Sequence, residues 1–372
     1  IDCHGGVYAM NRVLETVLKN GAKIAGPGEF TKRAFLNGRL DLSQAEAVMD
    51  VIQAKNEYAL RSSMDQLRGS VQKAIREIRA RLLHQIAYIE TALDDPEHFD
   101  LTGYPQELLE IVEKESENIS DLLKTADDGR MIQEGIKTVI LGKPNAGKSS
   151  LLNFLVGEDR AIVTEIAGTT RDILEEYISL NGITLRMIDT AGIRETEDIV
   201  EKIGVGKAKQ MAEDADLILY VVDSSLPLDD NDREIMELLS GRKSIVIYNK
   251  TDLEAAVSIE ELKEKTGSPV IPVSVVEETG LRQLEDEIKR MFFHGELSFN
   301  DEVYITNARH KAALEEADRS LDLVRNSIEM GMPEDFFSID LMNAYENLGK
   351  ILGESVGEDL VNEIFSKFCM GK

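Results

Sequence analysis

The segment 142–149, Gly-Lys-Pro-Asn-Ala-Gly-Lys-Ser, constrains the fold of this chain more than any other feature. It lies between a short apolar run and a helical stretch, which is the strand–loop–helix setting of a phosphate-binding loop, or P-loop. In such a loop the backbone N–H groups cradle phosphates, Lys148 reaches the β- and γ-phosphates, and the Ser149 hydroxyl meets Mg²⁺. The segment therefore predicts a nucleotide-binding α/β domain.

A glycine-rich turn can match this pattern by chance, but three further motifs follow in the order found in GTPases. Gly-Thr-Thr-Arg-Asp at 168–172 supplies Thr170 as a second hydroxyl ligand of Mg²⁺. Asp-Thr-Ala-Gly at 189–192 and Asn-Lys-Thr-Asp at 249–252 each follow an apolar run. Asp252 can accept two hydrogen bonds from the edge of guanine, and adenine is rejected because its edge would leave this carboxylate unpaired. The four motifs together predict a GTP-binding domain.

The last base-contacting loop is weaker, because Val-Ser-Val-Val at 273–276 replaces the usual Ser-Ala-Lys and only the serine carries over. The guanine oxygen is then contacted by backbone alone. The predicted nucleotide-binding residues are Asn145, Ala146, Gly147, Lys148, Ser149, Ser150, Thr164, Ile166, Gly168, Thr169, Thr170, Asp189, Gly192, Asn249, Lys250, Asp252 and Ser274.

The composition limits the partners and the compartment. The formal net charge of -27 disfavours direct binding of a phosphate backbone. If the function involves RNA, a partner protein is therefore expected to make most of the contacts that bind it. No apolar run approaches the roughly 20 residues that a membrane span needs. Cys3 and Cys369 lack disulfide-framework or zinc-ligand spacing. We expect a cytoplasmic protein that does not enter a membrane.

The periodicity predicts how the chain is divided. Apolar residues at steps of three and four predict one long helix over 43–93 and a second over 106–126, which Asp127-Asp128-Gly129 ends. Short apolar runs then alternate with helical stretches, which indicates a mostly parallel sheet, and helices return after about residue 294. The predicted fold is an α/β P-loop GTPase domain inserted into an all-helical domain. The predicted domains are 1–42, 43–134 (helical, first part), 135–295 (GTPase) and 296–372 (helical, second part).

Three stretches outside the nucleotide motifs carry a family resemblance. They are Pro-Gly-Glu-Phe-Thr with Arg-Ala-Phe-Leu-Asn-Gly-Arg-Leu-Asp-Leu within 27–42, Ala-Glu-Ala at 45–47, and the terminal Phe-Cys-Met-Gly-Lys. Together they resemble the tRNA uridine-modification GTPases of the MnmE (TrmE) family. Members begin with an α+β folate-binding and dimerisation domain, so the resemblance implies that 1–42 is the end of such a domain. Most of the site for a tetrahydrofolate derivative would then lie outside this chain.

The resemblance also implies an activity and partners. Family members hydrolyse GTP and work with a flavin-dependent protein, MnmG or GidA. Together they install an aminomethyl-type group, usually carboxymethylaminomethyl, on the wobble uridine of tRNA. The main alternative is a GTPase switch in ribosome assembly. It is less favoured, because such proteins usually append a basic RNA-binding module, and here the appended part is helical and the chain is acidic.

Ile193 occupies the position where Ras-like enzymes place a water-orienting glutamine, so substitutes are needed. The resemblance implies two. The first is a K⁺ ion held by Asn145 and by the loop residues Thr164, Ile166 and Thr169, with a second GTPase domain docked across the nucleotide in a homodimer. The second is Glu201, which would orient the attacking water. Asn145 can also be a simple turn residue, and Glu201 a carboxylate favoured by a helix N-terminus.

Cys369 lies four residues from the end of the sequence. Gly371 and Lys372 do not fit a prenylation signal. The remaining interpretations are a buried structural thiol and a thiol that takes part in the tRNA reaction, as the resemblance implies. The predicted catalytic residues are Glu201, Lys148, Thr170 and Cys369.

Overall fold

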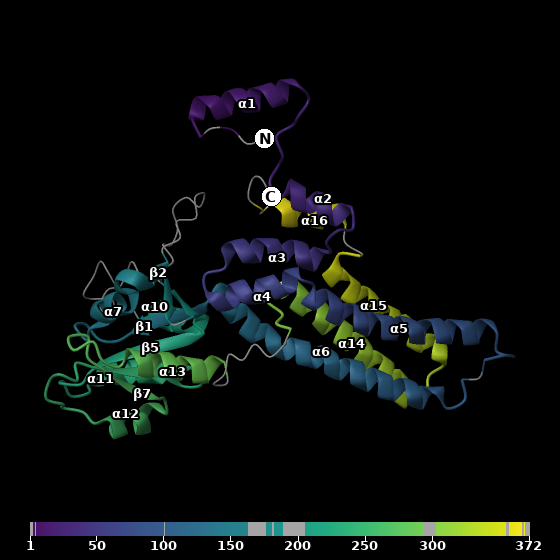
Figure 1. Cartoon of the computed structure of the whole chain (residues 1–372). Helices are drawn as coiled ribbons and strands as arrows, with labels where there is room; N and C mark the ends of the chain where they lie inside the picture. The colour runs from purple at the N-terminus through teal and green to yellow at the C-terminus, as the bar shows by residue number, and fades with distance from the viewer. Residues whose placement is uncertain are drawn as a thin grey trace. The chain divides into compact units, whose positions relative to one another are not determined.

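The computed structural model describes residues 3, 5–99, 101–162, 176–180, 182–188, 205–293, 303–354, 357–366 and 368; for 158–162, 205–208, 358–359 and 366 only the backbone is described. The chain forms two compact units, labelled by element in Figure 1. The helical unit comprises Ile1–Ile52, Ser63–Glu117 and Ala313–Lys372, and the sheet unit comprises Gln53–Ser62 and Asn118–Ala312. In the described part of the chain, no helix is both long and apolar enough to cross a membrane.

The sheet unit is built on a seven-stranded sheet of the described residues, with strand order β2-β3-β4-β1-β5-β6-β7. β1 pairs in parallel with β4 and β5, and β5–β6 and β6–β7 are also parallel, whereas β2–β3 and β3–β4 are antiparallel. The mostly parallel sheet is thus confirmed, with an antiparallel edge that the sequence did not predict. The strands are β1 (Ile136–Leu141), β2 (Ala161–Ile162), β3 (Glu176–Leu180), β4 (Ile183–Met187), β5 (Leu217–Asp223), β6 (Ser244–Asn249) and β7 (Val270–Val273).

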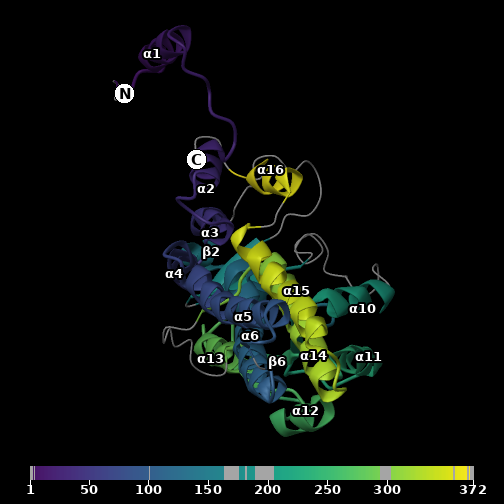
Figure 2. The same cartoon turned by 90° about the vertical axis from the view of Figure 1, so that its right-hand side faces the viewer.

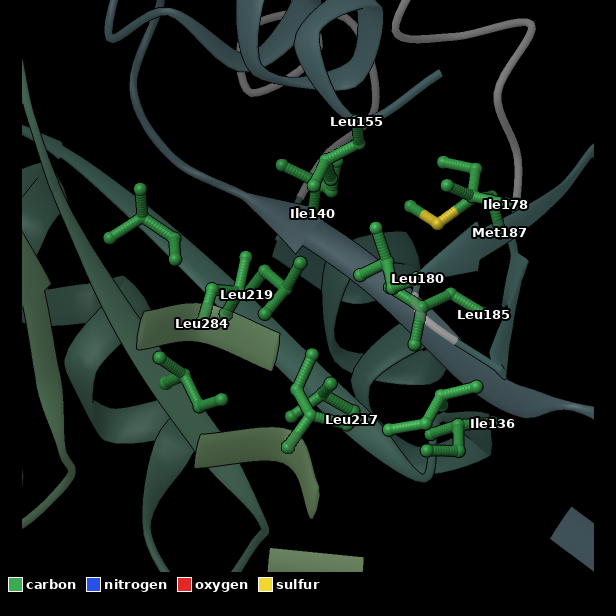
Figure 3. Close-up of a cluster of buried hydrophobic side chains, with 14 of the residues drawn as sticks. Ile136, Ile140, Leu155, Ile178, Leu180, Leu185, Met187, Leu217, Leu219 and Leu284 are labelled. Carbon is green, nitrogen blue, oxygen red and sulfur yellow. The ribbon is translucent and has the colours of Figure 1, made fainter. Parts of the chain in front are cut away.

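Helices cover both faces of this sheet, and side chains that alternate along each strand divide into two apolar clusters. On one face Ile140 and Leu219 pack with Leu155 of α7 and Leu284 of α13, as Figure 3 shows. On the other face Tyr220 and its alternating neighbours pack with α10, α11 and α12. The helices are α7 (Lys148–Arg160), α10 (Val205–Asp214), α11 (Asp230–Leu239), α12 (Ile259–Thr266) and α13 (Leu281–Phe292).

The helical unit is organised around α5 and α15, which lie side by side in Figure 2. The Arg79 guanidinium of α5 donates to the Tyr345 carbonyl at 3.2 Å and to the Glu354 carboxylate. Three helices, α4, α6 and α14, divide between the two units, and α3 contributes its last residue, Gln53, to the sheet unit. The helices of this part are α1 (Val7–Lys19), α2 (Glu29–Leu36), α3 (Leu42–Gln53), α4 (Glu57–Leu67), α5 (Ser70–Asp94), α6 (Tyr104–Glu134), α14 (Ala308–Glu329), α15 (Glu334–Leu352) and α16 (Glu358–Ser366).

The single long helix predicted over 43–93 is wrong, because the structure has three helices there, α3, α4 and α5. One break lies at Asn56, whose Oδ1 accepts the Ala59 N–H at 2.7 Å and caps the start of α4. The Asn56 amide also donates to the Ile132 carbonyl and the Thr184 hydroxyl, within the sheet unit. The second break lies at Gly69, whose φ of 96° is left-handed.

The end predicted for the second helix at about Ala126 is also wrong, because α6 continues through Asp127-Asp128-Gly129 to Glu134. Gly129 lies directly against the Ile305 backbone, and a Cβ added there would be 2.4 Å from the Ile305 carbonyl oxygen. Tertiary packing, rather than turn formation, therefore accounts for this glycine.

Candidate GTP-binding site

The P-loop joins the end of β1 to the start of α7 and has a backbone that few residue types allow. Gly142, Asn145 and Gly147 have φ values of 155°, 60° and 99°. Asparagine tolerates the left-handed region better than most non-glycine residues. Helix α7 begins immediately afterwards, with the Leu151 N–H bonded to the Gly147 carbonyl at 2.8 Å. The loop therefore points the N-terminus of a helix at the site where phosphates would bind.

The Lys148 ammonium is bound inside this loop. Its Nζ donates to the Gly142 carbonyl at 2.9 Å and to the Lys143 carbonyl at 2.6 Å, and the residue is 9% exposed. Two carbonyl contacts fix the direction of a flexible side chain. A preset ammonium is suited to stabilising charge on a phosphate, because little reorganisation is needed on binding.

The end of β6 contacts the P-loop directly. The Asn249 Nδ2 donates to the Ala146 carbonyl at 2.9 Å, and the Lys250 Nζ donates to the Asn145 carbonyl at 3.0 Å. A Cβ on Gly147 would lie 2.1 Å from the Asn249 Nδ2. Two motifs about a hundred residues apart in sequence are thus joined into one site.

Asp252 and Ser274 form the base-recognition part of the site. The Ser274 hydroxyl donates to the Asp252 Oδ1 at 2.7 Å and accepts the Glu277 N–H at 3.2 Å. Ser274 is fully buried, whereas Asp252 is exposed. The serine therefore orients a carboxylate that faces solvent, which is the group needed to accept the N–H donors of guanine.

Asp223, at the end of β5, is a residue of this site that the sequence analysis did not single out. Its carboxylate, 4% exposed, accepts from the Lys250 ammonium and from the Ser225 hydroxyl and N–H. Burial raises the pKa of Asp223, but the Lys250 and Ser225 hydrogen bonds outweigh it and hold the pKa below its usual value. The sequence signal that could have identified this residue is an Asp directly after the apolar run 217–222. In the sheet, Asp223 pairs in register with Asn249.

The structure brings together part of the predicted set. Asn145, Ser149 and Ser150 are exposed on the loop and on the first turn of α7, while Ala146 and Lys148 are buried beside Asn249 and Lys250. Nine predicted residues lie outside the described part of the chain: Thr164, Ile166, Gly168, Thr169, Thr170, Asp189, Gly192, Glu201 and Cys369.

Phe368, the first residue of the terminal motif, packs against Phe365 with 5.0 Å between the ring centroids. Both rings are buried in a cluster with Leu42.

The helical unit contains a separate cavity of about 660 Å³, lined by residues within 32–44, by Gln72 and Arg76 of α5, and by 352–354 with Val361 and Asn362. Its lining includes Arg39, Asp41, Gln44 and Arg76. The Asp41 Oδ1 accepts from Ser43 and Gln44 at the start of α3, but Oδ2 is buried without a hydrogen-bond partner in the described structure. A buried, unpaired acceptor in a polar cavity is the kind of group that a ligand N–H or a water satisfies.

Comparison with known proteins agrees with this geometry. A family model described as the MnmE helical domain matches residues 42–369, and one described as the N-terminus of the GTP-binding protein TrmE matches residues 1–39. The tRNA modification GTPase MnmE of Lachnoclostridium phytofermentans is 59% identical over 372 residues, which is 100% of this chain and 81% of that protein. Those of Geobacillus thermodenitrificans and Bacillus subtilis are 49% and 46% identical, covering 100% of this chain and 81% and 82% of theirs.

Among solved structures, the G domain of the Thermotoga (T. maritima) FeoB iron transporter is 28% identical, covers 41% of this chain and 96% of that chain, and has a TM-score of 0.30. The MnmE matches span the whole of this chain, including the P-loop and the base-recognition residues. This chain is a GTP-hydrolysing enzyme of tRNA modification, and it belongs to the MnmE family.

Proposed function

We propose that this protein hydrolyses GTP to drive modification of the wobble uridine of tRNA, by aminomethyl or carboxymethylaminomethyl addition, together with a flavin-dependent partner of the MnmG (GidA) type. The observation that carries the proposal is the match of the whole of this chain to the tRNA modification GTPases. The hydrogen bonds that orient the Lys148 ammonium and the Asp252 carboxylate agree with it. A GTPase switch in ribosome assembly is not favoured, because that match places the chain among modification enzymes.

The test is the state of the wobble uridine in cells that lack the gene. Expression of the intact chain, with whatever sequence precedes it in the natural protein, is expected to restore the modified nucleoside. Expression of the Lys148→Ala variant is not. Restoration by Lys148→Ala to the wild-type level would show that GTP hydrolysis is not needed for the modification.

The proposed metal ions are Mg²⁺ and K⁺. Ser149 and Thr170 would hold Mg²⁺, and Asn145 with Thr164, Ile166 and Thr169 would hold K⁺; Asp189 and Gly192 would sense the γ-phosphate. Asn145 supports the K⁺ proposal, because it is an exposed residue of the P-loop and has a left-handed backbone conformation. Oxygen ligands suit such hard cations. A bound K⁺ would supply the positive charge that an arginine finger supplies elsewhere.

Equal GTPase rates in KCl and NaCl would contradict the K⁺ proposal. An Asn145→Ala variant should lose the difference in GTPase rate between the two salts. Glu201 is proposed to orient the attacking water. Docking of two GTPase domains in a homodimer is proposed to complete the K⁺ site. Rates that rise with protein concentration would support the dimer.

A tetrahydrofolate derivative is the proposed carbon donor, and the match of 1–39 to the TrmE N-terminus supports it. The polar cavity of the helical unit is proposed to bind one part of such a molecule. The unpaired Asp41 Oδ2 can accept a pteridine N–H, and Arg39 and Arg76 can bind the glutamyl carboxylates. Isothermal titration of a tetrahydrofolate derivative into the intact protein and into its Asp41→Asn variant measures the contribution of this carboxylate to binding.

We also propose that the domains span 1–42, 43–134, 135–295 and 296–372, and that the protein is cytoplasmic. Cys369 is proposed as a thiol of the modification reaction rather than of GTP hydrolysis. A Cys369→Ser variant that hydrolyses GTP at the wild-type rate but leaves the tRNA unmodified would support this role, and full modification would exclude it.

A further inference from the structure

Lys143, the second residue of the P-loop, is a positive charge next to the expected phosphates. Its ammonium, however, is bound by two carboxylates of another element. The Lys143 Nζ lies 2.9 Å from the Asp229 Oδ2 and 2.7 Å from the Asp232 Oδ2, and its side chain is 13% exposed. Asp229 is the N-cap of α11 and Asp232 lies in its first turn. The P-loop is therefore tied by an ion pair to the start of α11.

The two carboxylates are held independently of the lysine. Asp229 and Asp232 form a capping box, in which each accepts the backbone N–H of the other at 3.1 and 3.0 Å. The hydroxyl of Tyr220, a buried residue of β5, donates to the Asp232 Oδ1 at 2.7 Å. The carboxylates thus form a rigid receptor for the ammonium.

The contact between Lys143 and Asp229 favours the charged form of both groups. Burial lowers the pKa of Lys143, but the hydrogen bonds that its ammonium donates to Asp232 and Asp229 outweigh burial and raise the pKa. The hydrogen bond from Lys143 lowers the pKa of Asp229. Release of the ammonium towards a phosphate would leave Asp232, 1% exposed, beside a second carboxylate without its counter-charge, which is costly.

The backbone of Lys143 shows what this ion pair can control. The Lys143 carbonyl accepts from the Lys148 Nζ at 2.6 Å and from the Ala146 N–H at 3.3 Å. The position of this carbonyl therefore helps to set the direction of the Lys148 ammonium. A side chain anchored to α11 restricts the backbone that carries the carbonyl.

We propose that Lys143 is a positioning residue, which acts through its ion pair with Asp229 and Asp232 to hold the P-loop in the shape that directs Lys148 at the phosphates, and that it is not itself a phosphate ligand. The inference deepens the GTPase function and rests on the assignment of 142–149 as the loop that binds the phosphates of GTP.

The experiment compares four variants in the intact protein: Lys143→Met, Lys143→Arg, Asp229→Asn and the double variant Lys143→Met/Asp229→Asn. Lys265→Met is the control, because Lys265 forms an exposed ion pair with Glu261 on α12 of the same unit. Nucleotide affinity is measured by titration with GDP, and kcat and KM with GTP. Thermal unfolding is followed in parallel.

Lys143→Met is expected to weaken GDP binding about tenfold or more and to raise KM, whereas Lys143→Arg stays within about threefold of wild type and Lys265→Met is unchanged. Asp229→Asn is expected to weaken binding in the same direction. The double variant is expected to be no weaker than Lys143→Met, because both changes break one interaction.

If Lys143 binds phosphate instead, Asp229→Asn frees the ammonium and leaves GDP affinity unchanged or stronger, which overturns the proposal. A lower thermal midpoint for Lys143→Met with unchanged GDP affinity also overturns it, since the ion pair would then be only structural. If Lys143→Met does not fold, Asp229→Asn alone decides between the two roles. Failure of the wild-type protein to bind GDP would instead refute the GTP-binding assignment itself.

Discussion

At the scale of single residues, the site depends on close contacts between motifs that are far apart in sequence. Gly147 is required twice, because its φ of 99° is left-handed and because the Asn249 amide occupies the space where a Cβ would lie. The Asn249 amide in turn bonds the Ala146 carbonyl. The general P-loop pattern explains the backbone of this glycine, but only the fold explains why its neighbour is Asn249.

Gly147→Ala is therefore expected to displace Asn249 and to weaken GDP binding by at least tenfold, or about 1.4 kcal/mol. Gly241→Ala is the matched control, because Gly241 also has a positive φ, 72°, but no atom within 4 Å of the added Cβ. Titration with GDP measures both. Equal affinities for the two variants would mean that the contact between Gly147 and Asn249 does not govern GDP binding.

Asp252 allows a test of base recognition. Asp252→Asn replaces an acceptor by a group that also donates, so it should weaken GTP binding and favour xanthosine triphosphate, which presents a carbonyl where guanine presents an amino group. We expect kcat/KM for GTP to fall at least a hundredfold, with xanthosine triphosphate becoming the better substrate. A variant that keeps its preference for GTP would remove Asp252 from the base-recognition role.

At the scale of elements, the packing of α6 decides a feature that local sequence rules read wrongly. Asp127-Asp128-Gly129 is typical of a turn, yet α6 runs through it. The cause is the Ile305 backbone, which approaches Gly129 more closely than any side chain would allow. The same helix holds the Ile305 N–H and the Val303 carbonyl through the Thr125 hydroxyl.

Gly129→Ala is thus expected to destabilise the protein by about 1–3 kcal/mol, because the added methyl overpacks the contact. In an open helix the same change is usually stabilising by roughly 0.5–1 kcal/mol. Glu113→Ala, on an exposed part of α6, should change stability by less than about 0.5 kcal/mol. Urea unfolding measures the difference; a stabilised Gly129→Ala protein would show that the segment near Ile305 yields easily.

At the scale of the whole molecule, charge sets how stability varies with pH. The net charge of -27 opposes the compact state by self-repulsion as carboxylates ionise. Asp50 on α3 adds to this, because burial and the nearby Glu46 raise its pKa to about 7. Asp223, Asp127 and Asp229 act in the opposite direction, since their pKa values are lowered in the folded protein.

The sign of each effect follows from linkage. The folded protein keeps a proton on Asp50 that the unfolded chain loses above its ordinary pKa of 3.8, so stability falls as pH rises from about 4 to about 7. Stability from Asp223, Asp127 and Asp229 is present above their unfolded pKa and is lost as pH falls through their lowered values. We expect the thermal midpoint to be higher at pH 6 than at pH 8.

Asp50→Asn should reduce that difference by raising the midpoint at pH 8. Asp65→Asn should leave it unchanged, because the Asp65 side chain, in the same unit, is 46% exposed. Thermal unfolding of the three proteins at both pH values tests this. An Asp50→Asn protein with the wild-type pH dependence would mean that Asp50 ionises normally in the folded state.

The sequence by itself determined the motif order, the alternation of helices and buried strands, the mostly parallel sheet and the family, because each depends on residues that are local or that match as a set. It missed β3 and the antiparallel edge, and it merged α3, α4 and α5. Only the tertiary structure decided that Asn249 and Lys250 bind the P-loop carbonyls, that Asp229 and Asp232 bind Lys143, and that Gly129 lies within a helix. These features arise from contacts between residues tens to hundreds of positions apart, and no periodicity or local propensity encodes which distant atoms meet.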